Sequence, residues 1–206
     1  MKSRVIGVLG IAILLSSCGD PPKTKPDSIA KDRVLTVNMQ EAADQADALL
    51  DGTIKAIHPE VEWSYSATTS QACTDWKGEA TEAGAVSRRR SVLTIISDER
   101  RGSFLGVVER HWKNSGYRII SVNESETFPA IYAETPEGFR IRLKFGYKGQ
   151  AHFQASTPCA EQSEVAPPKS AIGGPEYTEE KPPLPNKHSD FWSARTPVPS
   201  NGPDEG

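Results

Sequence analysis

The chain has 206 residues, with 24 lysines and arginines against 27 aspartates and glutamates, which gives a formal net charge of −3. This length is typical of a single domain. The slight excess of acidic residues argues against a nucleic-acid-binding protein, which would need a basic face. Apolar residues concentrate near the N-terminus and prolines near the C-terminus, so we expect distinct segments on both sides of the domain.

Residues 1–17 are predicted to form a signal peptide. Lys2 and Arg4 supply a basic start, and the eleven residues from Val5 to Leu15 carry no charge, as in the apolar region of a signal peptide. A helix of that length rises about 16 Å, roughly half of the hydrocarbon core of a bilayer. The segment is therefore too short to span a membrane.

The residues Leu15-Ser16-Ser17-Cys18 resemble the lipobox of bacterial lipoprotein precursors at all four positions. The resemblance implies that residues 1–17 are removed and that Cys18 becomes a lipid-modified N-terminus carrying diacylglycerol and palmitate. Two or more acyl chains form a durable anchor, whereas one chain binds reversibly. We therefore expect a lipid-anchored protein on the extracytoplasmic face of a cell membrane. The alternative is an ordinary secretory signal, with Cys18 merely near the cleavage point.

Two segments flank the predicted domain. Residues 18–33 are polar and contain prolines without periodicity, so we expect a flexible tether. Residues 160–206 contain nine prolines and eight acidic residues against four basic ones, which predicts a disordered acidic tail. Phe191 and Trp192 are unusual in such a tail. They are either an incidental pair or a docking point on a partner or on the domain.

Cys73 and Cys159 are expected to form a disulfide, because a lipid-modified Cys18 cannot pair. An oxidising extracytoplasmic compartment favours the bridge, which would close a loop of more than eighty residues. The alternative is a reactive or metal-binding pair. The sequence offers no Cys-x-x-Cys motif and no histidine near either cysteine for that alternative.

The predicted domain, residues 34–159, begins with a helix over residues 38–57. Asn38 and Glu41 have the spacing of a capping box. Apolar residues recur at intervals of three and four along one face, which indicates packing against a core. The carboxylates Asp44, Asp47 and Asp51 are placed away from that face.

A second helix is expected to start with Ser97 or Asp98 as its cap and to end at Gly116. Residues 135–138 have the composition of a turn. The remaining apolar alternation and β-propensity predict strands, namely 61–67, 91–96, 117–122, 130–134, 139–145 and 151–155. Residues 68–86 are expected to be irregular, and Arg88, Arg89 and Arg90 to be a solvated approach to a strand.

These elements predict a two-layer α+β domain in which an antiparallel β-meander is packed by two helices and closed by one disulfide. With its anchor, cysteine pair and proline-rich end, the chain resembles uncharacterised small lipoproteins of high-GC Gram-positive bacteria. That resemblance transfers no functional residue beyond Cys18. An outer membrane lipoprotein that faces the periplasm is the alternative.

Residues 139–145 carry the candidate site. Arg140, Arg142 and Lys144 alternate with apolar residues, so all three project to one face of the strand. The face is a candidate anion-binding surface for a phosphate headgroup, an anionic envelope polymer or an acidic envelope protein. The alternative is a solvated sheet face or an edge strand protected by charge. His152 and Gln154 are expected beside it.

The sequence carries no recognisable catalytic or metal-binding motif. The four histidines are scattered, namely His58, His111, His152 and His188. We therefore expect no enzyme, no metal and no cofactor. The predicted function is a non-catalytic binding or accessory module of the cell envelope, held to the membrane by its lipid. The alternative is a surface hydrolase or a small-ligand carrier, with a pocket between sheet and helices lined by aromatic residues such as Trp63, Tyr65 and Trp112.

Overall fold

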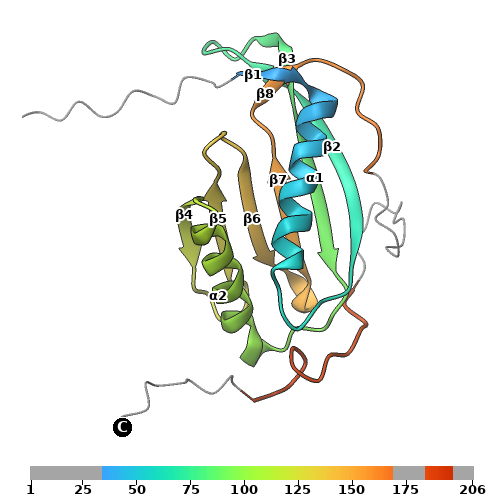
Figure 1. The fold of residues 1–206 in the computed structure, drawn as a ribbon, viewed down its shortest axis with the longest axis vertical. Coiled ribbons are helices and arrows are strands. Elements are labelled where there is room, and N and C mark those ends of the chain that lie inside the picture. Colours follow the sequence, from blue (N-terminus) through green and yellow to red (C-terminus); the bar gives the residue numbers. More distant parts are fainter. Residues whose placement is uncertain (1–33, 169–183, 197–206) are drawn as a thin grey trace, which may run out of the picture. The chain divides into compact units, whose positions relative to one another are not determined.

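The computed structural model of the chain describes residues 34–168 and 184–196. The predicted signal peptide, Cys18 and the predicted tether lie outside these residues. Two α-helices and one sheet of eight strands make up the described part, which confirms the predicted α+β class (Figure 1). The helices are α1 (Met39–Lys55) and α2 (Asp98–Asn114). The strands are β1 (Val34–Asn38), β2 (Trp63–Thr74), β3 (Ala80–Val92), β4 (Arg118–Asn123), β5 (Ala130–Glu134), β6 (Arg140–Phe145), β7 (Ala151–Ser156) and β8 (Cys159–Glu161).

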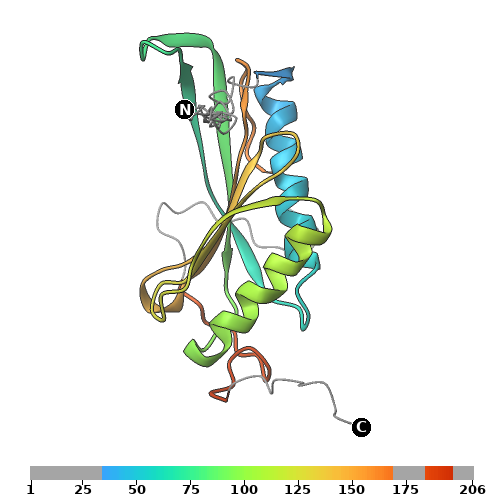
Figure 2. The same ribbon diagram turned by 90° about the vertical axis from the view of Figure 1, so that its left-hand side faces the viewer.

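The strands follow the order β1-β8-β3-β7-β6-β5-β4, and β2 pairs with β3 outside this path. From β4 to β7 each strand is antiparallel to the next one in sequence, as the predicted meander requires. The strands β1 and β8 are parallel. Both helices cover the same face of the sheet, with α1 against β3 and β7 and α2 against β4 and β5 (Figures 1 and 2). The opposite face of the meander carries no helix among the described residues.

Helix α1 begins and ends close to its predicted bounds. Asn38 is the N-cap, and the predicted capping box is present: the Asn38 side chain accepts from the Glu41 amide, and the Glu41 carboxylate accepts from the Asn38 amide. The residues of its apolar stripe are buried. Helix α2 follows Ser97, and Gly116 after its end has a φ of 79°, as predicted for a left-handed helix stop.

The segment predicted to be irregular, residues 68–86, is instead most of a long antiparallel hairpin formed by β2 and β3. The predicted strand at residues 91–96 is the end of β3, which stops at Val92. The far half of β2 is exposed on both faces. That part of β2 buries neither face, so it has no reason to alternate apolar and polar residues. Burial does alternate in β3 from Gly84 onward, but Gly84, Arg88 and Arg90 occupy three of the buried positions, so the sequence shows no apolar alternation there.

Phe104 of α2 lies at the centre of the main core. Its ring centroid is 5.9 Å from that of Phe145 and 6.2 Å from that of Phe153, on neighbouring strands. The apolar residues predicted to form the inner face of the strand over residues 139–145 are all buried, namely Phe139, which immediately precedes β6, and Ile141, Leu143 and Phe145 of β6. Trp112 is fully buried and donates from Nε1 to the Thr53 hydroxyl at 3.0 Å, which joins α2 to α1.

The described parts of the predicted disordered tail are ordered, which corrects that prediction for residues 160–168 and 184–196. Ala160 lies in β8 and is fully buried. Trp192 is only 1% exposed and packs edge-on against Phe104 at 5.0 Å. The Arg100 guanidinium lies over the Phe191 ring at 4.7 Å. The aromatic pair therefore docks on the domain itself.

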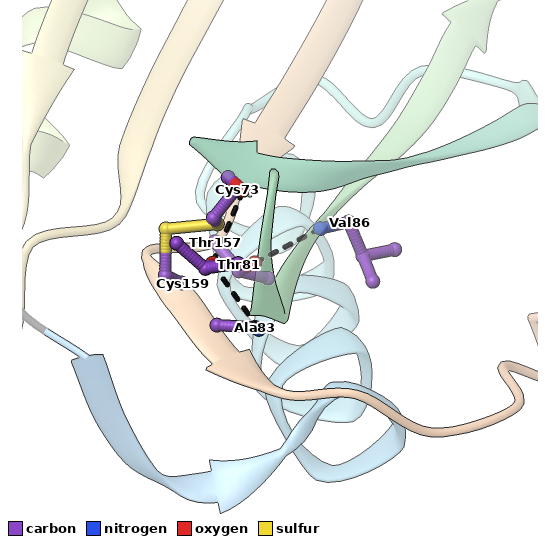
Figure 3. The surroundings of a disulfide bond; sticks show 6 residues. All are labelled: Cys73, Thr81, Ala83, Val86, Thr157 and Cys159. Atoms are coloured by element: carbon purple, nitrogen blue, oxygen red, sulfur yellow. Dashed lines mark hydrogen bonds between the residues drawn. A yellow bond between two sulfur atoms is a disulfide. The ribbon is translucent and has the colours of Figure 1, made fainter. Parts of the chain in front are cut away.

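Cys73 and Cys159 form the predicted disulfide, with a Cα–Cα distance of 6.2 Å (Figure 3). It ties the end of β2 to the start of β8. Thr81, on the opposite strand of the hairpin, donates from its hydroxyl to the Cys73 carbonyl at 3.1 Å. Thr157 accepts from the Val86 amide at 3.0 Å and holds the chain just before Cys159 against β3. The bridge therefore braces the distal half of the hairpin.

Candidate anion-binding face

The three predicted anion-binding residues of β6 all lie on the sheet face opposite the helices. Ile141 and Leu143 between them are buried in the core, and successive side chains of a strand point to opposite faces. Arg140 and Lys144 are exposed, and Arg142 is half-buried. The geometry therefore groups Arg140, Arg142 and Lys144 as the alternation predicted.

A fourth basic residue joins this face from β3. Arg89 and Arg142 are both cross-strand partners of Gln154 on β7. Arg89 donates from Nε to the Gln154 Oε1 atom at 3.0 Å, and Arg142 donates to the same oxygen at 2.6 Å. One amide oxygen thus holds two guanidinium groups close together. The Gln154 amide nitrogen donates to the hydroxyls of Ser156 and Ser87, which fixes the orientation of the amide.

His152 lies next to these residues on β7, opposite Lys144 on one side and Ser91 on the other. Its Nδ1 atom is 3.1 Å from the Ser91 hydroxyl, which is 2.6 Å from the Ser66 hydroxyl. Burial lowers the pKa of His152 below its usual value, and the positive charges of Arg89, Arg142 and Lys144 lower it further. Ser91 is fully buried, so it is a structural partner of His152 and is closed to a substrate.

The face carries an excess of positive charge among the described residues. Glu134 is the acidic neighbour of Arg140 across β5 and β6, and it forms an ion pair with Arg118 on β4. Within residues 34–168 and 184–196, neither Arg89 nor Arg142 lies within ion-pair distance of a carboxylate. We call the residues Arg89, Arg140, Arg142, Lys144, His152 and Gln154 the basic sheet face.

The arginine run of β3 is divided between the two sides of the sheet, which corrects its prediction as a solvated approach. Arg88 and Arg90 are fully buried on the helix side. Asp47 of α1 forms an ion pair with the Arg88 Nε atom at 3.0 Å and accepts a hydrogen bond from Arg90 at 2.7 Å. Asp51 adds a contact with Arg90 at 3.1 Å. From its position in the helix, Asp47 was predicted to point away from the packed face. It instead faces the two buried arginines of β3.

Arg89 was not predicted to belong to the basic sheet face, because the arginine run was placed outside a strand. The three arginines stand at consecutive positions, so a strand that contains them sends the middle one to the face opposite the other two. The carboxylates Asp47 and Asp51, one helical turn apart on α1, were the signal that two buried cations face this helix.

The aromatic residues proposed to line a pocket have other roles. Trp112 is a core residue bonded to Thr53. Trp63 and Tyr65 enclose the Arg90 guanidinium, whose carbon atom lies 5.0 Å and 4.1 Å from the two ring centroids. Across the described ranges, no group of three or more histidine, cysteine, aspartate or glutamate residues is arranged to hold a metal ion. No helix in the described part of the chain is long and apolar enough to cross a membrane.

No protein-family model matches the chain, and no curated protein matches it. The solved structures similar to it include a DUF4853 family protein from Actinomyces odontolyticus ATCC 17982, with 13% identity, coverage of 70% of this chain and 79% of that chain, and a TM-score of 0.39. They also include the candidate lipoprotein LppA from Mycobacterium tuberculosis, with 15% identity, coverage of 59% and 75%, and a TM-score of 0.30. Similarities this remote transfer neither function nor site residues.

Proposed function

We propose that the protein is a lipid-anchored, non-catalytic binding module of the cell envelope that uses its basic sheet face to bind a phosphate- or carboxylate-bearing partner. The lipobox resemblance at Cys18 supports the extracytoplasmic location and the anchor. The arrangement of Arg89, Arg142 and Gln154 supports the binding role. The two parts of the proposal rest on different residues and are tested separately.

The observation that carries the binding role is the convergence of Arg89 and Arg142 on one neutral oxygen. Two like charges held side by side repel each other, and the Gln154 amide lowers this cost without cancelling either charge. A bound anion would supply the missing negative charge. Guanidinium groups keep N–H donors in a fixed planar fork, which suits the paired oxygens of phosphate or carboxylate.

The support for these side chains is rigid. Arg89, Arg142 and Gln154 project from three adjacent strands, β3, β6 and β7, whose inner faces are buried in the core. A site preorganised on strands loses less conformational entropy on binding than one built on a loop. Arg140 and Lys144 extend the positive surface along β6, so the face can contact several anionic groups of one partner.

The sharpest test is the substitution Gln154→Glu, which is nearly isosteric. It places a carboxylate between Arg89 and Arg142 and should abolish anion binding while keeping the fold. Calorimetry of the lipidated mature chain in detergent uses inorganic phosphate, polyphosphate, polyglutamate and mixed micelles of phosphatidylglycerol with the same detergent as separate ligands. The comparison distinguishes the free ion, a phosphate or carboxylate polymer and a lipid headgroup. Unchanged affinity of Gln154→Glu for every ligand that the wild type binds contradicts the proposal, and so does a wild type that binds none.

A matched pair of double variants separates a site from general electrostatic attraction. Arg89→Gln with Arg142→Gln removes two charges from the face, and Lys55→Gln with Lys113→Gln removes two from the helices. Charge-assisted hydrogen bonds contribute roughly 1.5–3 kcal/mol each, so the first pair should weaken binding by at least about tenfold. The second pair should change it little. Equal losses would indicate attraction by net charge alone.

A further inference from the structure

Trp76 is the most exposed of the large apolar side chains that the structure describes, at 87%. It lies in the turn between β2 and β3. Asp75 holds this turn, because its carboxylate accepts from the amides of Lys77 and Glu79 at 2.8 and 2.9 Å, and its own amide donates to the Glu79 carbonyl at 2.8 Å. Gly78 completes the turn with a φ of 83°, which a residue with a side chain rarely adopts. The indole is thus presented to solvent on a defined support.

The support extends back to the disulfide. Cys73 lies three residues before Trp76 and is bonded to Cys159, so the tip cannot fold back independently of the sheet. Exposure of a large aromatic side chain has no stabilising effect on the domain itself. An indole held on a braced tip is therefore suited to contact another surface.

The same end of the domain receives the chain from the predicted anchor. Val34, the first described residue, is the strand partner of Cys159, and Cys159 is bonded to Cys73. Both views place β1 and the turn of the β2–β3 hairpin at the same end of the domain (Figures 1 and 2). The fifteen residues 19–33 between Cys18 and this end can span at most about 50 Å. An anchored domain therefore keeps Trp76 within reach of the bilayer.

From this arrangement we propose that Trp76 inserts into the interfacial layer of the membrane that holds the lipid anchor, so that the β2–β3 tip rests on the bilayer. The inference rests on the anchor of the proposed function. Tryptophan favours the headgroup level of a bilayer, where its ring meets apolar atoms and its N–H meets polar ones. The anchor makes this second contact intramolecular, so a single weakly binding side chain is sufficient.

The charges around the tip define which lipids this contact needs. Lys77 lies with its ammonium 5.0 Å from the centroid of the Trp76 ring and can reach the phosphates beside an inserted indole. Asp75, Glu79 and Glu82 are close in sequence and offset this single cation. The contact therefore depends on the indole and requires no anionic lipid. This separates it from the basic sheet face, whose ligands are anions.

Fluorescence quenching of Trp76 by brominated lipid tests the insertion. The lipidated mature chain is reconstituted into phosphatidylcholine vesicles that contain phosphatidylcholine brominated near the carbonyl groups, and flotation confirms the anchor. Trp76→Phe serves as the spectral blank, because Trp112 and Trp192 are buried and Trp63 is partly buried. The emission of Trp76, taken as the difference between wild type and Trp76→Phe, should shift to the blue on vesicles and be quenched by brominated lipid. The double variant Arg89→Gln with Arg142→Gln should show the same shift and the same quenching.

A chain that floats with the vesicles but keeps unquenched, solvent-exposed Trp76 emission overturns this inference and leaves the anchor intact. Such a result would direct attention to a protein partner for the tip. A chain that fails to float overturns the anchor of the proposed function and this inference with it. Anion binding to the basic sheet face, measured in detergent, is independent of both results.

Discussion

The indole Nε1 atom of Trp192 donates a 2.6 Å hydrogen bond to the carbonyl oxygen of Pro59, a residue 133 positions earlier in the chain. The Trp192 carbonyl in turn accepts from the amide of Ser97, immediately before α2. Asn186 and Lys187 donate from their amides to the Leu93 carbonyl. The segment 184–196 is therefore a structural part of the domain, and it closes the end of the core next to Phe104.

We expect Trp192→Ala to lower the free energy of unfolding by about 3–5 kcal/mol, because it removes a large core side chain and leaves a cavity. Urea denaturation followed by circular dichroism measures this loss. Trp76→Ala is the matched control at an exposed position and should change the free energy by no more than about 0.5 kcal/mol. Equal and small effects of the two substitutions would contradict the docking of the segment.

Asp47 is the ionic partner of two fully buried guanidinium groups, those of Arg88 and Arg90. Asp47→Asn keeps the size of the side chain but leaves buried positive charge uncompensated, so we expect a loss of about 3–5 kcal/mol. Asp51→Asn should cost less, because the Asp51 side chain is 47% exposed and contacts Arg90 alone. Denaturation of both variants checks this order, and a larger loss for Asp51→Asn would refute the assignment of Asp47 as the main partner.

His152 should make the domain less stable in mild acid. Its pKa in the folded state is lowered by burial and by Arg89, Arg142 and Lys144, so the unfolded chain binds more protons there than the folded chain. The contribution of His152 to the free energy of unfolding is then fully present above pH ~6.5. It is lost as the pH falls from the ordinary histidine pKa through the lowered one. His152→Gln should remove this dependence, as denaturation at a series of pH values would show.

The same imidazole reports on anion binding. An anion held by Arg89 and Arg142 would offset the positive charges that lower the pKa of His152, so saturation with a bound anion should raise this pKa. A nuclear magnetic resonance titration of the His152 ring, with and without ligand, measures the change. Gln154→Glu should also raise the pKa, because it supplies a fixed negative charge at the same place.

Reduction of the Cys73–Cys159 bridge should destabilise the domain. The two cysteines are separated by 86 residues, and in the chain-entropy description a loop of that length corresponds to about 4–5 kcal/mol. The double substitution Cys73→Ser with Cys159→Ser should lower the free energy of unfolding by this amount, which urea denaturation shows as a lower midpoint concentration. Wild-type protein unfolded in a reducing buffer provides the comparison, and equal midpoints with and without reductant would show that the bridge contributes nothing.

Sequence alone was sufficient for the elements whose signal is local. The capping box at Asn38, the helix stop at Gly116, the turn before Phe139 and the apolar alternation of β6 each depend on residues within a few positions of one another. The grouping of Arg140, Arg142 and Lys144 followed from the same alternation. The cysteine pair followed from parity once Cys18 was assigned to the lipid.

Only the tertiary structure decided how distant segments combine. Arg89 meets Gln154 across 65 positions, Arg90 meets Asp47 across 43, and Trp192 meets Pro59 across 133. The far half of β2 buries little, and the buried positions of β3 include Gly84, Arg88 and Arg90, so this part of the hairpin lacks the apolar alternation that would identify it. The burial of two arginines and the exposure of Trp76 could not be predicted from the sequence either. A residue's surroundings depend on which chain segments pack against it and not on its own type.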